Sequence, residues 1–314
     1  MKTKFLLCVA AITLTLFPIL NFAQAPNLGT CSTFALFTAA GAFSNDGATV
    51  VTGDIGTNVG AFTGFPPGIV YGSIHVANGI SAQAAADVDV AYSYLDNLTC
   101  GLVIGTTLGN GQSLTPNIYC LGAASTLNGD LVLDGGGDPS SIFVFEIDGA
   151  LSTTTLSTVT LINSASLCNV YWQVNGAVSL GEGSVFQGTI IANGAISLLE
   201  ASALYGRALS RGGAIDMHNN VVNVPTSPVA STISSNGGAT TFCEGDSVIL
   251  TGNVGGVWNN GDTASSITVF TGGDYFVTNT TNCGSETSNH IIVTVTSCSS
   301  VCTAPVVSSI DSVC

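Results

Sequence analysis

A short phrase that recurs along the middle of the chain constrains its fold more than any other feature. The phrase is glycine, alanine and an aliphatic residue, and it occurs as Gly149-Ala150-Leu151, Gly176-Ala177-Val178, Gly194-Ala195-Ile196 and Gly213-Ala214-Ile215. The first step is 27 residues, and the next two are 18 and 19. Each phrase opens a short alternating apolar segment. Repetition at this period predicts a β-solenoid, in which each coil buries its inner face against the next.

The N-terminal residues 1–25 predict a secretory signal peptide. A basic start precedes an apolar run from Phe5 to Leu20, and small residues follow it. Cleavage after Ala23 is favoured, because a cut after Ala25 would place Pro26 next to the scissile bond. No other segment is long and apolar enough to span a bilayer. The expected location is therefore secreted or on the extracellular cell surface, without membrane insertion.

The charge balance excludes several classes of partner. The chain has 4 Lys and Arg against 19 Asp and Glu, and only 7% of its residues are charged. Two of the four basic residues, Lys2 and Lys4, lie in the predicted signal peptide. Such a chain has no positive surface for nucleic acid or an anionic membrane. We expect a surface made largely of small uncharged residues.

The chain divides into a solenoid over residues 26–224, a linker over 225–230, and a second β-rich region over 231–297. Within the solenoid, residues 81–98 carry apolar side chains every three or four positions, which predicts an amphipathic helix with Ser81 as its N-cap. In residues 231–297, four alternating segments separated by Gly and Asn predict a small β-sandwich. Residues 298–314 are interpreted as the start of a further segment or as a linker, truncated in this sequence.

Without Cys8 of the signal peptide, nine cysteines remain in an exported chain, so disulfides are expected. Cys100 ends the helical region and Cys120 ends a predicted strand. We predict a Cys100–Cys120 disulfide that pins the helix to the solenoid. The alternative is two separate buried thiols, because free cysteine is often buried.

The sequence offers little for catalysis or metal binding. Its histidines, His75, His218 and His290, have no paired ligand spacing, and no serine lies in a nucleophile-elbow sequence. The Asp134–Asp138 segment, Asp-Gly-Gly-Gly-Asp, has the composition of a calcium loop, but it occurs once and is interpreted as a tight turn. We expect no cofactor and no enzyme activity. A polysaccharide enzyme that uses carboxylates alone ranks below the other hypotheses.

Alignment of the coils on one inward apolar residue gives outward positions by period-two alternation. The residues interpreted as inward are Val50, Leu127, Val159, Phe186, Leu204 and Val222. The residues before them are Thr49, Thr126, Thr158, Val185, Ala203 and Val221, and those after them are Val51, Asn128, Thr160, Gln187, Tyr205 and Asn223. The first outward column is wholly uncharged and small or β-branched, although β propensity alone favours such residues in strands.

Residues 28–224 resemble the microbial ice-binding protein family. The matching stretches include residues 49–56, 64–68, 114–119, 133–139, 168–174 and 206–209, with the helix over 81–98. The resemblance implies a mainly β fold: a right-handed β-solenoid with one long α-helix alongside. Many ice-active members carry Thr-Ala/Gly-any-Thr/Asn on a flat face. The fourth position stays Thr, Val or Ala here, while the first holds Asp46, Glu182, Glu200 and His218.

The resemblance implies adsorption to the surface of an ice crystal and inhibition of ice growth or recrystallisation. The expected ice-binding residues are Thr49, Thr126, Asn128, Thr155, Thr158, Thr160, Val185, Ala203 and Val221. The alternative is a non-enzymatic cell-surface adhesion module that binds glycans or other surface proteins. The region 231–297 resembles the immunoglobulin-like modules of exported Bacteroidetes proteins, and that resemblance implies a Cys243–Cys283 disulfide.

Overall fold

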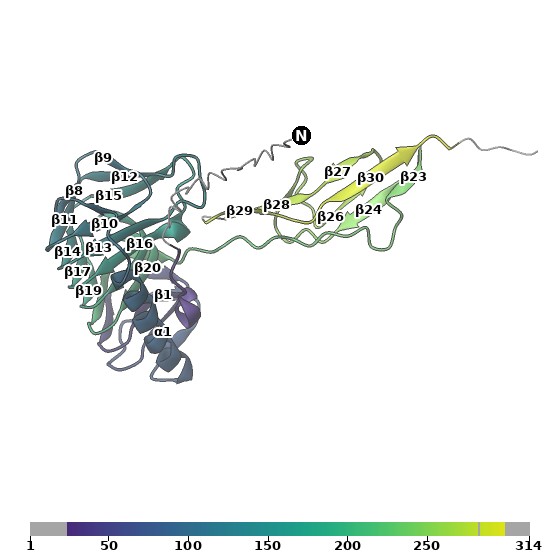
Figure 1. The fold of residues 1–314 in the computed structure, drawn as a ribbon. Helices are drawn as coiled ribbons and strands as arrows, with labels where there is room; N and C mark the ends of the chain where they lie inside the picture. Colours follow the sequence, from purple (N-terminus) through teal and green to yellow (C-terminus); the bar gives the residue numbers. More distant parts are fainter. Residues whose placement is uncertain (1–23, 282, 299–314) are drawn as a thin grey trace, which may run out of the picture.

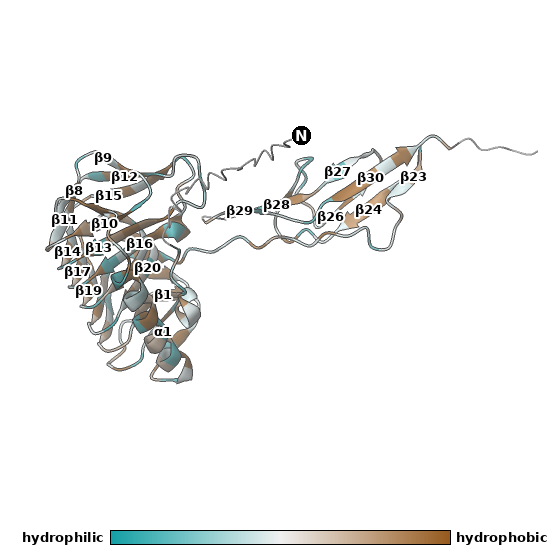
Figure 2. Ribbon diagram, viewed as in Figure 1, coloured by the Kyte–Doolittle hydropathy of each residue, from teal (hydrophilic) through white to brown (hydrophobic). Residues whose placement is uncertain are grey.

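The computed structural model describes residues 24–281 and 283–298, so the predicted signal peptide and its cleavage site lie almost wholly outside the described residues. A β-solenoid with one long helix is followed by a smaller β unit (Figure 1). Hydrophobic residues run through the strands of both parts, including β24 and β30 (Figure 2). Among the described residues, no helix has the length and apolar character to cross a membrane.

One side of the solenoid is a sheet of seven parallel strands in the order β2-β21-β19-β17-β14-β11-β8. Each strand is short, as expected when every coil must turn a corner. The strands are β2 (Phe43–Asp46), β8 (Thr107–Gly109), β11 (Ser125–Asn128), β14 (Leu151–Thr153), β17 (Val178–Leu180), β19 (Ile196–Leu198) and β21 (Ile215–His218).

The remaining coil segments form a second sheet of fifteen strands. They are β1 (Phe34–Thr38), β3 (Val50–Thr52), β4 (Asp54–Thr57), β5 (Ile69–Tyr71), β6 (Ile74–Val76), β7 (Leu102–Val103), β9 (Gln112–Leu114), β10 (Asn117–Leu121), β12 (Asp130–Asp134), β13 (Phe143–Ile147), β15 (Thr158–Ile162), β16 (Val170–Val174), β18 (Val185–Ala192), β20 (Ala203–Ser210) and β22 (Val221–Asn223). β18 pairs with β15 through its first residue and with β16 through its second half. The long strands therefore join two faces of the solenoid.

The coils do not follow the order of the sequence. The N-terminal strands β1, β2 and β3 pair with β20, β21 and β22 of the last coil. The chain must then reach the far end of the solenoid, where β7, β8 and β9 begin. Helix α1 (Gly79–Asp96) makes this crossing, because its 18 residues extend about 27 Å along the coils.

Helix α1 begins two residues before the predicted start and ends two before the predicted end. Its N-cap is Asn78, whose side chain accepts a hydrogen bond from the Ser81 backbone N–H, while the Ser81 hydroxyl accepts one from the Asn78 N–H. The prediction of Ser81 as N-cap is wrong, because Ser81 is the third helical residue of a capping box. The apolar face of the helix packs on the sheet through a cluster that includes Val88, Leu95 and Tyr171.

The C-terminal β unit contains short sheets that are mainly antiparallel. Its strands are β23 (Thr241–Cys243), β24 (Val248–Thr251), β25 (Val257–Trp258), β26 (Ser266–Val269), β27 (Gly273–Tyr275), β28 (Val277–Thr281), β29 (Gly284–Thr287) and β30 (Ile291–Thr296). A core around Leu250, Trp258 and Val277 is separate from the solenoid core.

Two short 3-10 helices, Gly29–Ser32 and Leu167–Asn169, lie within the solenoid region.

Candidate functional site: a flat face of small residues

The outer face of the seven-stranded sheet carries two regular rows of small side chains. The repeated phrase places an aliphatic residue inward, so the alanine before it and the residue after it point outward. The alanine row, in spatial order, is Ala42, Ala214, Ala195, Ala177, Ala150 and Ala124. The hydroxyl row is Ser44, Asp216, Ser197, Ser179, Ser152, Thr126 and Thr107, so six of its seven residues are Ser or Thr.

Burial confirms this alternation. Leu151, Val178, Ile196 and Ile215, which separate the two rows, are at most 2% exposed. The alanines and hydroxyl residues are exposed or half-exposed. Strand spacing fixes the repeat of each row at about 4.8 Å, so six spacings extend about 29 Å. The result is a long, flat array in which both rows repeat at the strand spacing.

Glycine begins the phrase because the corner before the alanine row has no room for a side chain. A Cβ on Gly176 would lie 2.7 Å from the Ala150 nitrogen, and one on Gly213 would overlap the Ala195 backbone nitrogen. Neighbouring coils therefore stack backbone on backbone at this corner. That close approach keeps the edge of the face level with the alanine row.

The residues predicted to bind ice do not lie on one face. Thr126 and Asn128 belong to β11 of the seven-stranded sheet. Five others lie on the fifteen-stranded sheet: Thr158, Thr160, Val185, Ala203 and Val221. Of these five, Thr158, Val185, Ala203 and Val221 are in register on adjacent strands. The predicted column therefore lies on two separate surfaces. Thr126 and Asn128 come before a corner of the coil, and the five residues of the fifteen-stranded sheet come after a corner.

The outward position predicted for Thr49 is wrong. Thr49 is fully buried, and its hydroxyl accepts a hydrogen bond from the Asn220 N–H at 3.0 Å. Val50 pairs with Val221 and Val51 with Val222, so Val51 is the inward residue, and the prediction of Val50 as inward is also wrong. A shift of one residue moves every side chain of a strand to the opposite face.

Thr155, Glu182 and Glu200 lie at corners of the coils, whereas Asp46 is the last residue of β2. Thr155 is exposed in the turn between β14 and β15. Glu182 and Glu200 are exposed in the equivalent turns after β17 and β19. These carboxylates therefore lie beside the flat faces and not within their middle rows. The acid that does stand in a row is Asp216, which the sequence prediction did not single out.

One of the disulfides among the described residues, Cys168–Cys283, joins the solenoid to the C-terminal β unit. The structure contains the predicted Cys100–Cys120 bridge, between the segment after α1 and strand β10. The predicted Cys243–Cys283 bridge is wrong, because Cys243 pairs with Cys298 and Cys283 pairs with Cys168. Cys31 is a buried free thiol whose pKa is raised to about 12, chiefly by burial.

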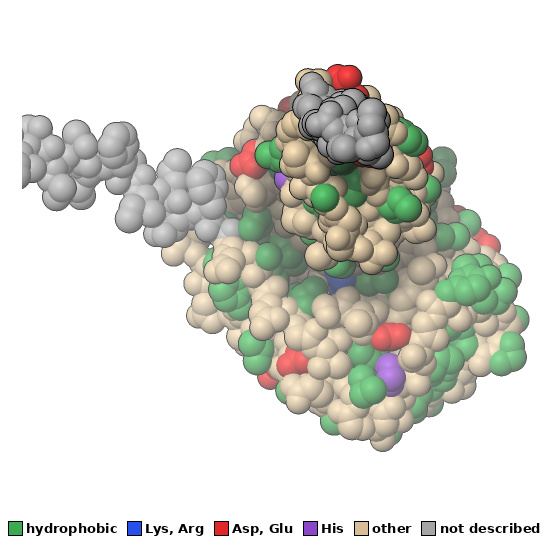
Figure 3. All heavy atoms as spheres, turned by 90° about the vertical axis from the view of Figure 1, so that its right-hand side faces the viewer, with side chains coloured by type: hydrophobic (Ala, Val, Ile, Leu, Met, Phe, Trp, Pro, Cys, Tyr) green, Lys and Arg blue, Asp and Glu red, His purple; other side chains and the backbone are tan. Residues whose placement is uncertain are grey.

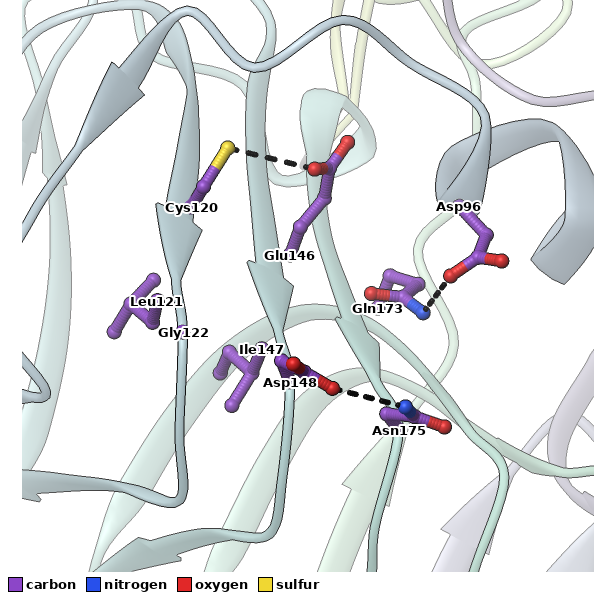
Figure 4. A pocket seen from close by; sticks show the side chains of 9 residues that line it. All are labelled: Asp96, Cys120, Leu121, Gly122, Glu146, Ile147, Asp148, Gln173 and Asn175. Carbon is purple, nitrogen blue, oxygen red and sulfur yellow. Dashed lines mark hydrogen bonds between the residues drawn. The ribbon is translucent and has the colours of Figure 1, made fainter.

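A small polar cavity lies beyond the C-terminal end of α1 (Figure 4). Its volume is about 170 Å³, below the range of about 300 Å³ or more that is usual for ligand sites. Glu146 and Asp96 both line this cavity, and burial followed by the charge of Asp96 raises the pKa of Glu146 to about 7. Gln173 donates to Asp96, and Asn175 donates to Asp148. This cavity is too small to hold sugar rings on both sides of a scissile bond.

Within residues 24–281 and 283–298, no group of three or more His, Cys, Asp or Glu is placed to bind a metal. The Asp134–Asp138 segment forms a turn, as expected from its composition. Asp134 accepts hydrogen bonds from the Gly136 N–H and the Asn163 amide, and these lower its pKa. Charged side chains are few and isolated on the face shown in Figure 3, where uncharged residues dominate.

The signal for the flat face was present in the sequence. Each Gly-Ala-aliphatic phrase is followed by Ser152, Ser179, Ser197 or Asp216, and the same order occurs as Gly41-Ala42-Phe43-Ser44. Alignment on the phrase itself would have found both rows. Alignment on inward residues such as Val159, Phe186 and Leu204 placed most of the predicted column on the fifteen-stranded sheet, after the corner of the coil.

The comparisons with known proteins agree with this architecture. A family model described as ice-binding-like matches residues 37–223. An ice-binding protein of Nostoc sp. (strain HG1) is 35% identical over 199 residues, which are 62% of this chain and 73% of the relative.

Two solved structures have the same fold over the solenoid. A crystal structure of an ice-binding protein from the Antarctic ascomycete Antarctomyces psychrotrophicus matches with a TM-score of 0.63 and 35% identity, over 65% of this chain and 100% of that one. One from an Antarctic Flavobacteriaceae bacterium matches with a TM-score of 0.62 and 40% identity, over 70% of this chain and 54% of that one. Because the family model covers more than half of the chain, the chain belongs to the ice-binding-like family.

Proposed function

We propose that this chain binds ice through the outer face of the seven-stranded sheet and thereby inhibits ice growth or recrystallisation. Ice binding is a non-enzymatic activity, and the family membership supports it for this chain. The observation that carries the choice of face is the pair of in-register rows, alanine and Ser/Thr, that repeat at the strand spacing.

The physical basis is the summation of many weak contacts. A methyl group and a hydroxyl order few waters alone, but a rigid array orders a layer of them with one period. The Thr126 and Ser152 hydroxyl oxygens lie 3.3 Å apart, within hydrogen-bond distance, so neighbouring coils already share part of this pattern. The other open face is rougher, because Tyr205 and Tyr71 stand 39% and 65% exposed on it.

Access to the face also supports the proposal. The labelled strands β8, β11, β14, β17 and β19 lie along the side of the solenoid away from the C-terminal β unit (Figure 1). Helix α1 packs on β13, β16 and β18, which belong to the other sheet. A crystal surface could thus approach the seven-stranded sheet without displacing either element.

The three disulfides among residues 24–281 and 283–298 support an extracellular location, since such bonds persist in oxidising compartments. These bonds and the signal peptide expected over residues 1–25 support secretion or attachment to the cell surface. The C-terminal β unit is proposed to be an immunoglobulin-like sandwich that acts as a spacer. Its separate core and its short antiparallel sheets support this assignment.

The test compares two tyrosine substitutions on different faces. Ser179 lies in the middle of the hydroxyl row between Ser152 and Ser197, and Thr160 is exposed on β15 of the other sheet. Fluorescent fusions are incubated with a growing ice hemisphere. We expect Ser179→Tyr to abolish ice adsorption and Thr160→Tyr to retain it. The reverse result would assign ice binding to the other face, and a wild-type protein that never enters ice would refute the function.

A further inference from the structure

We infer that Asp216 sets one end of the ice-binding surface, so that the strip from β8 to β19 contacts ice and the strands β21 and β2 do not. This inference rests on the proposed function. Asp216 occupies the position of the hydroxyl row that holds Ser or Thr in the other six strands. Its neighbours in register are Ser197 on β19 and Ser44 on β2.

The Asp216 carboxylate alters the hydroxyl row on two strands, β21 and β2. The Ser44 hydroxyl donates a hydrogen bond to Asp216 Oδ1, so this hydroxyl is engaged within the protein. Asp46, two residues farther along β2, lies opposite His218 of β21. The end of the sheet formed by β21 and β2 therefore carries ionisable groups at three outward positions, Asp216, Asp46 and His218. The hydroxyl row from Thr107 to Ser197 is uncharged.

Hydration chemistry separates these two parts of the face. A carboxylate binds water far more strongly than a hydroxyl or a methyl group does, and removal of that water is costly. Water around Asp216 is therefore organised by its charge and not by the strand repeat. The uncharged strip spans about 19 Å across five strands, against about 29 Å for all seven.

The decisive variant is Asp216→Ser, which introduces the residue found at this position in β2, β14, β17 and β19 and frees the Ser44 hydroxyl. We expect the fraction of protein that partitions into ice at low concentration to rise about two- to five-fold, which corresponds to about 0.4–1 kcal/mol of added adsorption free energy. Asp216→Asn is the second variant. It removes the charge while its amide oxygen still accepts from Ser44, and its partitioning should also rise.

The chain offers a matched control on the other sheet. Asp130 is a strand carboxylate that accepts a hydrogen bond from the Thr158 hydroxyl at 2.6 Å, in register with it on the next strand. Asp130→Ser makes the same change in charge and removes the same kind of contact. Its ice partitioning should equal that of the wild type.

Three outcomes would overturn the inference. If both Asp216 variants fold and partition like the wild type or less, Asp216 does not limit the surface. If Asp130→Ser raises partitioning as much as Asp216→Ser, the cause is net charge. If Ser179→Tyr retains full ice adsorption, the face itself is wrong and the inference fails with it. By contrast, loss of adsorption in Ser179→Tyr with no gain in Asp216→Ser refutes only the role of Asp216.

Discussion

Cys168 and Cys283 form a disulfide across 115 residues of sequence, with their Cα atoms 5.1 Å apart. Cys168 lies in the short 3-10 helix Leu167–Asn169 of the solenoid, and Cys283 lies between β28 and β29 of the C-terminal β unit. The Ser166 hydroxyl donates a hydrogen bond to the Cys283 carbonyl at 2.9 Å. The two parts of the chain are thus joined by the linker and by a second, covalent contact.

Removal of this bridge should free the C-terminal β unit. For the double substitution Cys168→Ser with Cys283→Ser, we expect a larger radius of gyration in small-angle X-ray scattering. We also expect the unit to lose about 2–4 kcal/mol of unfolding free energy, because the bridge closes a long loop in the unfolded chain. Calorimetry measures this loss. Cys100→Ser with Cys120→Ser is the control and should leave the radius of gyration unchanged.

Substitution at the glycine corner should destabilise the solenoid. In Gly176→Ala the new Cβ would lie 2.7 Å from the Ala150 nitrogen and 2.8 Å from the Gly149 carbonyl carbon. Because backbone atoms cannot move aside cheaply, we expect a loss of about 2 kcal/mol or more of unfolding free energy in urea. Gly122→Ala is the control, since nothing lies within 4 Å of the methyl group that it would add and it should change stability by less than about 0.5 kcal/mol. Equal stability of the two variants would contradict close stacking at this corner.

The sequence was sufficient for the solenoid and for the helix beside it. The Gly-Ala-aliphatic phrase reports a corner without room for a side chain, and the spacing of Ala84, Val88, Ala91 and Leu95 reports the buried side of α1. Both patterns involve residues of a single coil or a single helix, so they are the same whatever the order in which the coils pair. For this reason they did not show that the first coil pairs with the last.

The site could be predicted only in part, because alternation distinguishes inside from outside and does not say which sheet a residue joins. Thr126 and Thr158 both precede a buried aliphatic residue. Thr126 nevertheless lies on the seven-stranded sheet and Thr158 on the fifteen-stranded sheet, with a corner of the coil between the two sheets. At Thr49 the register differs by one residue, which placed the hydroxyl inside. The pairing of Cys283 with Cys168 depends on how the two parts meet, and cysteine spacing carries no information on that.

Glu146 should make the solenoid less stable as the pH rises. Its pKa is raised from 4.5 to about 7, first by burial and then by the charge of Asp96. Between these pH values the folded state holds a proton that the unfolded state has released, so the free energy of unfolding falls through this window and then stays low. Because Glu146 is only half-buried, solvent screening limits the loss to about 1 kcal/mol.

The variant Glu146→Gln tests this expectation by chemical denaturation at two pH values. The neutral amide should raise the free energy of unfolding relative to the wild type at pH 8 and leave it nearly unchanged at pH 4. Glu286→Gln, a substitution of an exposed glutamate on β29, serves as the control. A difference between Glu146→Gln and the wild type that is the same at both pH values would show that the carboxylate charge is not the cause.

The C-terminal β unit should be dispensable for ice adsorption. It has its own core around Trp258 and its own Cys243–Cys298 bridge, and the proposed ice-binding face contains none of its strands. The shortened chain should end at Pro228, because the Arg207 guanidinium donates a hydrogen bond to the Pro225 carbonyl at 3.1 Å and this contact belongs to the solenoid. Cys168→Ser is included so that the lost bridge leaves no reactive thiol. We expect this protein to enter a growing ice hemisphere as the full chain does, with Ser179→Tyr in the same background as the negative control. A folded, soluble shortened chain that no longer adsorbs to ice would show that the C-terminal β unit takes part directly.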